Sequence, residues 1–266
     1  MEDRHSRQTF LGPKSEDIIR SSIIGVIGLG GGGSQIVQQL AHIGFLNYVL
    51  YDGQQIERSN LNRLIGAYDS DPESAMPKID IAQRLIKGLQ PNANIQAYKS
   101  RWQENPLPLR ECDIIFGCLD GFAERQEIEI CARRYLIPYI DIGLDVHQGT
   151  PPSMSGQVIL SLPEKPCMKC LDFLSDRNLA IEASKYGVAG IRPQVVWGNG
   201  ILALIAVGIG VDLLTDWTLT EDRIVYLSFD GNRGCVKEHI RLEYLQSFDC
   251  PHFPLSNVGD PIYKKI

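Results

Sequence analysis

The chain has 266 residues, of which 44% are hydrophobic and 22% are charged. This composition is typical of a folded globular protein that can bury a large core without disulfide bonds. The net charge of -6 argues against a non-specific nucleic-acid-binding protein, which would be basic. An odd number of cysteines and a charged N-terminus without an apolar leader predict a soluble protein of the reducing cytoplasm.

The first half of the chain alternates short apolar runs with segments of helical apolar spacing. Runs of this kind are typical of strands buried on both faces. The alternation predicts an α/β fold with a Rossmann-like, mostly parallel sheet and helices on both faces. In chain order we expect a strand at 22–27, a helix at 34–43, a strand at 48–51, a helix at 77–89, strands at 94–98 and 113–118, a helix at 123–135 and a strand at 137–142.

The second half predicts antiparallel strands that extend the sheet. We expect a strand at 157–162, a loop or short helices at 171–190, a buried helix at 193–214, strands at 223–229 and 234–242, and an irregular tail from 248. The helix approaches the length of a membrane span, but its glycines, Asn199 and Asp212 favour a core helix and no membrane contact. Because no linker interrupts the chain, residues 1–266 are expected to form one domain, with a nucleotide-binding half at about 1–145 and a carrier-binding and zinc half at about 146–266.

A glycine-rich loop follows the first predicted strand. Gly28, Gly30, Gly31 and Gly33 lie between that strand and a predicted helix, where glycines allow a tight turn and close approach to a phosphate. Asp52 ends the second predicted strand, where a carboxylate can bind ribose hydroxyls. Together these residues predict a nucleotide site, without specifying the nucleotide.

Charged and amide side chains after Asp52 favour ATP over a dinucleotide. Asn60 and Arg63 follow in the run SNLNR, and Lys78 opens the next helix after a proline. Cationic side chains of this kind neutralise phosphates. Asp120 follows the fourth predicted strand, and a carboxylate in that position is suited to Mg²⁺.

These motifs, together with Arg7-Gln8 and the pair Cys167-x-x-Cys170, resemble the ThiF/MoeB/HesA family, the bacterial relatives of the ubiquitin-activating enzymes. The resemblance covers nearly the whole chain. It implies an enzyme that uses ATP to adenylate the C-terminal carboxylate of a small ubiquitin-like or sulfur-carrier protein ending in Gly-Gly. By this resemblance Asp52 holds the ribose, Asp120 holds Mg²⁺, and the phosphates are held by Asn60, Arg63 and Lys78. Arg7 is similar to an arginine that reaches the partner subunit's site, which implies a homodimer.

The cysteine pair has the spacing of half a structural zinc site. Relatives supply a second pair near the C-terminus, where this chain has Cys250 and His252 followed by Phe253. We expect Cys167, Cys170, Cys250 and His252 to form a Cys₃His zinc site, with loss of the metal as the alternative. The remaining cysteines, at positions 112, 118, 131 and 235, are expected to be apolar core residues.

Two departures from the family bear on the reaction. Ubiquitin-activating enzymes transfer the acyl group to their own cysteine, but this chain has none between Cys170 and Cys235. Transfer of the adenylate directly to another protein or to a sulfur donor is therefore expected. The second departure is Gly121, which follows Asp120 at a position where members of the family commonly have asparagine. The alternatives are adenylation of a peptide C-terminus, an NAD-dependent oxidoreductase, and a scaffold without catalytic activity.

Overall fold

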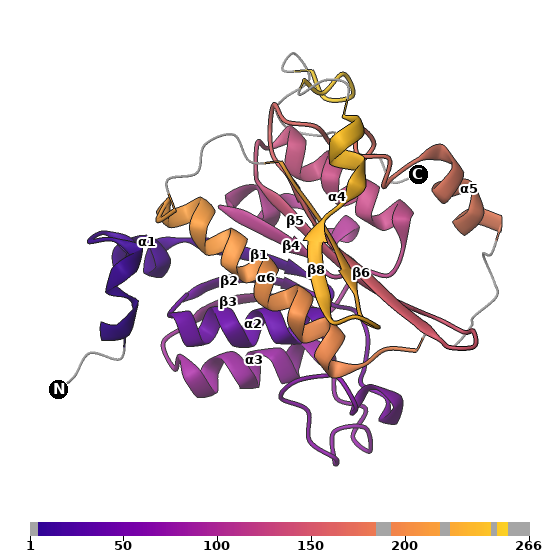
Figure 1. The fold of residues 1–266 in the computed structure, drawn as a ribbon. Coiled ribbons are helices and arrows are strands. Elements are labelled where there is room, and N and C mark those ends of the chain that lie inside the picture. Colours follow the sequence, from indigo (N-terminus) through magenta and orange to yellow (C-terminus); the bar gives the residue numbers. More distant parts are fainter. Residues whose placement is uncertain (1–4, 185–192, 219–223, 246–248, 255–266) are drawn as a thin grey trace.

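The computed structural model describes residues 5–184, 193–218, 224–245 and 249–254. These residues build an eight-stranded sheet in the order β3-β2-β1-β4-β5-β6-β7-β8 (Figure 1). Neighbouring strands from β3 to β5 pair in parallel, and those from β5 to β8 pair antiparallel. The predicted Rossmann-like sheet with an antiparallel extension is therefore confirmed. The strands are β1 (Ile23–Ile27), β2 (Asn47–Tyr51), β3 (Asn94–Tyr98), β4 (Ile114–Gly117), β5 (Tyr139–His147), β6 (Ser153–Ser161), β7 (Val225–Asp230) and β8 (Cys235–Glu238).

Helices cover both faces of the sheet, as predicted. One face carries α1 (Ser15–Ser21), α2 (Gly31–Ile43), α3 (Lys78–Leu89) and α6 (Val196–Thr215) (Figure 1). The other face carries α4 (Phe122–Arg134), and α5 (Asp176–Ser184) packs against α4. Short 3-10 helices lie at Ser6–Leu11, Arg58–Asn60, Trp102–Glu104, Leu107–Glu111 and Ile240–Tyr244.

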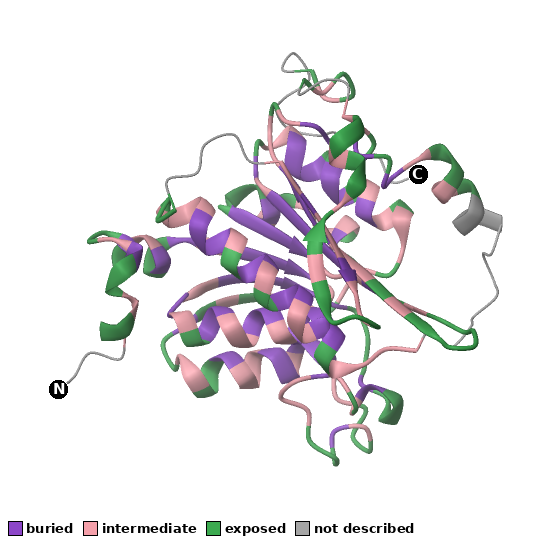
Figure 2. Cartoon of the chain, viewed as in Figure 1, coloured by how far each residue is buried: buried purple, intermediate pink, exposed green. Residues whose placement is uncertain are grey.

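The central strands divide the hydrophobic core between the two faces. On β2, Tyr48 and Leu50 pack toward α2 and α6, whereas Val49 and Tyr51 pack toward α4. This alternation is the period-2 geometry of a strand, and both side-chain sets are apolar because both faces are covered. Buried residues dominate the centre of the sheet (Figure 2).

Helix α6 confirms the predicted core helix. Its inner face, including Leu202, Ala203 and Ala206, is buried in the core, whereas Trp197 and Leu204 are exposed. Length and composition alone would allow this helix to cross a bilayer, but 56% of its most apolar window is buried inside the protein. Two glycines of α6 allow the helix to pack closely. A Cβ at Gly210 would lie 2.8 Å from the Phe116 ring, and a Cβ at Gly198 would lie 2.9 Å from Leu144.

Several predicted boundaries were wrong. β5 continues to His147 and β6 begins at Ser153, because their outer halves form a hairpin that alternates exposed and less exposed side chains. β8 ends at Glu238, before the 3-10 helix Ile240–Tyr244. Helix α5 occupies part of the predicted segment 171–190, and positions 185–190, 223 and 248 lie outside the described residues. Helix α1 was not predicted.

Candidate active site

A cavity of about 500 Å³ opens at the carboxyl ends of β1, β2 and β4. This is where open α/β sheets bind their ligands. The cavity brings together residues that are separated by more than a hundred positions in the chain. Of the predicted site residues, those lining it are Gly28, Gly30, Gly31, Asp52, Asn60, Arg63, Lys78 and Asp120.

The glycine loop turns the chain from β1 into α2. Gly28 has a φ of +87°, which L side chains rarely adopt, and a Cβ there would meet the Cys118 carbonyl oxygen at 2.6 Å. Gly30 is the N-cap of α2, so the amino end of this helix faces the cavity. Gly33 does not line the cavity: a Cβ there would lie 1.9 Å from the Gly28 carbonyl oxygen. The structure therefore places Gly33 as the packing contact that brings α2 against the loop.

Asp52 is buried at the end of β2, with 8% of its surface exposed. Its carboxylate accepts hydrogen bonds from the backbone N–H of Leu29 at 2.7 Å and of Gln54 at 2.8 Å. These bonds connect the glycine loop to the segment after β2. A carboxylate fixed in this way at the cavity edge is suited to accept hydrogen bonds from ribose hydroxyls.

Lys78 is the first residue of α3 and is 8% exposed. Its Nζ donates to Gln54 Oε1 at 2.6 Å, which orients the ammonium group within the cavity wall. The Asn60 Oδ1 accepts from the Glu57 backbone at 3.1 Å, so the side-chain group that could donate to a phosphate is its NH₂. Arg63 donates to the Ser59 carbonyl at 2.6 Å. Two cations and an amide thus line the same cavity.

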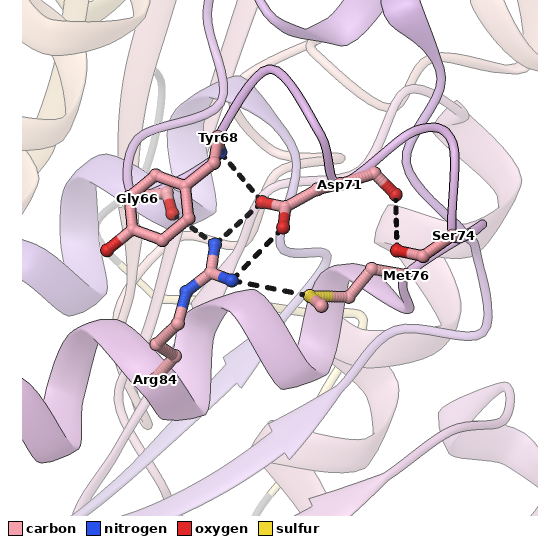
Figure 3. Close-up of polar contacts among 6 residues, drawn as sticks. All are labelled: Gly66, Tyr68, Asp71, Ser74, Met76 and Arg84. Carbon is pink, nitrogen blue, oxygen red and sulfur yellow. Dashed lines mark hydrogen bonds and ion pairs between the residues drawn. The ribbon is translucent and has the colours of Figure 1, made fainter.

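The loop that carries Asn60 and Arg63 is fastened to α3 by Arg84 (Figure 3). The Arg84 guanidinium binds both oxygens of Asp71, at 2.6 and 3.1 Å, and donates to the Gly66 carbonyl at 2.7 Å. It also lies 4.0 Å from the centre of the Tyr68 ring. Because Lys78 and Arg84 share one helix, this clamp ties the loop to the same rigid element as the lysine.

We expect Asp71→Asn to destabilise the protein by about 1.5–3 kcal/mol at pH 7, because it removes a buried charge-assisted bond. The Arg84 hydrogen bond holds the pKa of Asp71 below its ordinary value. A carboxyl with a depressed folded-state pKa stabilises the protein above its unfolded pKa, about 4, and loses that contribution as the pH falls further. Urea unfolding at pH 7 and pH 3.5 should therefore show the wild-type advantage shrinking in acid.

The matched control for this variant is Asp69→Asn in the same loop. Asp69 has 83% of its side chain exposed and lies 3.5 Å from Arg58, which is 64% exposed. Exposed pairs contribute at most about 1 kcal/mol, so this variant should unfold close to the wild type. Equal urea midpoints for the two variants at pH 7 would contradict the clamp.

Asp120 is an exposed residue on the rim of the cavity, just after β4. Gln194 Nε2 lies 3.4 Å from its Oδ1. In nucleotide sites Mg²⁺ is commonly held by one or two carboxylates together with phosphate oxygens and water. An accessible carboxylate that lines the same cavity as Lys78 and Arg63 fits this requirement.

The structure also adds residues that sequence reasoning missed. Asn199, on the first turn of α6, lines the cavity and is 6% exposed. Its amide lies against Gly31, where a Cβ would be 2.6 Å from Nδ2. Gln54 and Gln194 also line the cavity. The sequence did contain a signal for Asn199, because it is a polar residue within the apolar run that forms α6.

Arg7 lies in the 3-10 helix Ser6–Leu11, where it is exposed and does not line the cavity of its own chain. Arg7 is therefore not part of the candidate site formed by its own chain. The role of Arg7 in a partner subunit's site stays a prediction.

Four predicted metal ligands meet on the far side of the sheet from α6. The ligand atoms of Cys167, Cys170, Cys250 and His252 all lie within 4.8 Å of one another. Cys170 Sγ lies 3.6 Å from Cys167 Sγ, 3.8 Å from Cys250 Sγ and 3.3 Å from His252 Nδ1. Tetrahedral Zn²⁺ with bonds of roughly 2.3 Å to sulfur requires sulfur–sulfur separations of about 3.8 Å. The cluster therefore fits a zinc site of the Cys₃His type.

The expectation that the other cysteines are core residues holds for two of the four. Cys112 and Cys131 are buried. Cys235 is exposed on the edge strand β8, so the prediction was wrong there, because an edge strand has no neighbour on one side. Cys118 lines the cavity, and burial raises the pKa of its thiol, which disfavours the nucleophilic thiolate.

Comparison with known proteins identifies the family of this chain. Residues 3–250 match the model of the ThiF family. The SAMP-activating enzyme E1 of Haloferax volcanii is 27% identical over 200 residues, which cover 73% of this chain and 71% of that protein. The sulfur carrier protein adenylyltransferase of Thermus thermophilus is 28% identical over 206 residues, covering 73% of each chain.

A solved structure with the same fold is that of E. coli MccB with ATP. It superposes with a TM-score of 0.74 at 16% identity, covering 97% of this chain and 75% of MccB. At this level of identity the similarity establishes the fold. Since the family model spans residues 3–250, nearly the whole chain, the chain belongs to the ThiF family.

Proposed function

We propose that this protein adenylates the C-terminal carboxylate of a small ubiquitin-like or sulfur-carrier protein, with ATP as the nucleotide. The observation that carries the proposal is the composition of the cavity. The buried carboxylate of Asp52 and the amino end of α2 lie in the same cavity as Lys78, Arg63 and Asp120. Relatives named as adenylyltransferases of such carriers support the substrate class.

The chemistry requires positioning and charge neutralisation more than proton transfer. The attacking carboxylate is already ionised at neutral pH, so no general base is needed. Its oxygen attacks the α-phosphorus, and pyrophosphate leaves. In this proposal Lys78 and Arg63 neutralise the phosphates, and Asp52 orients the ribose. Mg²⁺, when held by Asp120, would supply further charge neutralisation on the triphosphate.

The adenylate is then open to attack by an external thiol, amine or sulfide. We infer that no enzyme thioester precedes this step, since Cys118 is the cavity-lining cysteine among the described residues and its thiol pKa is raised. We also propose a homodimer in which Arg7 contributes to the partner's site. The exposure of Arg7 in its own chain is compatible with that role.

The test is a thermal unfolding experiment with ATP and Mg²⁺ and, in parallel, with NAD. A ligand at about 100 times its dissociation constant stabilises by about 2.7 kcal/mol. We expect ATP with Mg²⁺ to raise the melting temperature of the wild type, and Lys78→Met to lose most of this gain. Methionine keeps the length of the stem but removes the charge that faces the phosphates.

Lys99→Met is the matched control, because Lys99 is 56% exposed and pairs with Asp80 rather than facing the cavity. It should respond to ATP as the wild type does. Stabilisation by NAD without a response to ATP would contradict the proposal and favour an oxidoreductase. Carrier-dependent exchange of pyrophosphate into ATP then distinguishes a Gly-Gly carrier protein from a short peptide as the substrate.

A further inference from the structure

A buried ion pair lies behind the wall of the cavity. Arg125 of α4 is 5% exposed and Asp141 of β5 is fully buried, and the guanidinium contacts the carboxylate through Nη1. Asp141 Oδ1 also accepts a hydrogen bond from the Tyr139 hydroxyl at 2.9 Å. Burial raises the pKa of Asp141, and the neighbouring Arg125 opposes this shift. Because desolvation offsets much of the attraction in a buried pair, stability is a weak explanation for it.

The Arg125 guanidinium also contacts the backbone beside Asp120, the rim carboxylate suited to Mg²⁺. Arg125 Nη2 donates to the carbonyl oxygen of Leu119. That carbonyl and the N–H of Asp120 belong to one planar peptide group, so fixing the oxygen fixes the plane from which Asp120 projects. Leu119 and Asp120 both line the cavity, whereas Arg125 does not.

A glycine allows the guanidinium to lie this close to the cavity. Gly143 of β5 lines the cavity, and a Cβ there would come within 2.5 Å of Arg125 Nη2. Arg125 therefore lies directly behind a wall made of Leu119, Asp120 and Gly143. Its forked donor group can bond a carboxylate and a carbonyl together, which a lysine cannot do.

We propose that Arg125, anchored by Asp141, is a positioning residue that holds the Leu119–Asp120 peptide in the orientation needed for divalent-cation binding. This role rests on the proposed function. Substitution of Arg125 should therefore weaken the binding of Mg²⁺ but leave the affinity for metal-free ATP unchanged. The reason is that the described hydrogen bonds of Arg125 reach neither the glycine loop nor Asp52. Outer partners of metal ligands typically change metal affinity by about 10–100-fold.

The experiment titrates Mg²⁺ at fixed ATP and records the melting temperature. The midpoint of the ATP-induced rise should move to about tenfold higher Mg²⁺ in Arg125→Lys. Without added Mg²⁺, the shift that ATP produces in this variant should match that of the wild type. Asp120→Asn should remove the Mg²⁺-dependent part, which ties the readout to this carboxylate. A purely structural role for Arg125 would lower the melting temperature without ligand and leave the midpoint unchanged.

Arg133→Lys is the matched control. Arg133 lies on the same helix, is 3% exposed, and donates to Ser161 Oγ and to the Pro166 carbonyl beside the cysteine cluster. Its conversion to lysine should leave the Mg²⁺ midpoint at the wild-type value. If Arg125→Lys does not fold, Asp141→Asn replaces it, because it removes the anchor while keeping the guanidinium, and its midpoint should move in the same direction.

The outcomes separate the two proposals. A wild type that gains no stability from ATP with Mg²⁺ overturns the adenylation proposal and the positioning role with it. A wild type that responds, with an unshifted Mg²⁺ midpoint in the folded Arg125 or Asp141 variant, overturns the positioning role alone. A raised midpoint in that variant, with Arg133→Lys unchanged, supports it.

Discussion

Replacement of Gly33 by alanine is expected to destabilise the protein by about 3 kcal/mol or more, the upper range for overpacking a core. The added Cβ would lie 1.9 Å from the Gly28 carbonyl oxygen and 2.9 Å from its carbon. Both atoms are backbone, so no side-chain rotation can relieve the contact. Helix α2 must move away from β1, and the glycine loop must move with it. Urea unfolding measures the loss, and ATP should no longer raise the melting temperature.

Gly30→Ala is the control for this variant within the same loop. A Cβ on Gly30 would meet no atom within 4 Å. The variant should therefore unfold within about 1 kcal/mol of the wild type, as expected for a substitution without a clash or strain. Any loss of ATP binding in Gly30→Ala would then report on the phosphate region and not on folding. Equal stabilities for the Gly33 and Gly30 variants would contradict the packing role of Gly33.

Removal of zinc is expected to produce a loss of similar size. The cluster links the segment around Cys167 and Cys170 to the C-terminal segment around Cys250, so the metal would close a long loop. On the scale of a lost cross-link, Cys250→Ser should cost about 2–5 kcal/mol. Metal analysis should find one zinc per wild-type chain and much less in the variant, and a chelator should lower the urea midpoint of the wild type only.

Cys235→Ser is the matched control, because Cys235 is exposed on β8 and lies outside the cluster. It should keep both the zinc and the stability of the wild type. A wild type purified without zinc, and insensitive to added zinc and to chelator, would show that the cysteines have kept their geometry without the metal.

The local parts of this site could be predicted from the sequence. A buried strand, a glycine loop and a helix follow one another within about twenty residues, and each has its own local pattern. The positions of Asp52, Lys78 and Asp120 in the fold could be predicted because short sequence patterns mark the ends of strands and the starts of helices. Their convergence followed from the rule that parallel strands present their carboxyl ends at one edge.

What the sequence could not predict depends on contacts between distant segments. Gly33 looks like a phosphate-binding glycine, and its packing on Gly28 appears only in three dimensions. The Asp71–Arg84 clamp and the Arg125–Asp141 pair join residues whose spacing matches no local pattern. The outer halves of β5 and β6 were missed because they lack the continuous apolar run that marks a strand covered on both faces.

Because Asn199 of α6 lines the cavity, the cavity is completed late when the chain folds during synthesis. The parallel strands and the glycine loop lie before residue 148, but Asn199, which packs on that loop, arrives with α6. A growing chain therefore has all five parallel strands before it has the last wall of its pocket. The proposed nucleotide site therefore gains its last lining residues only when α6 docks across α2, and stabilisation by a bound nucleotide would be complete only after that step.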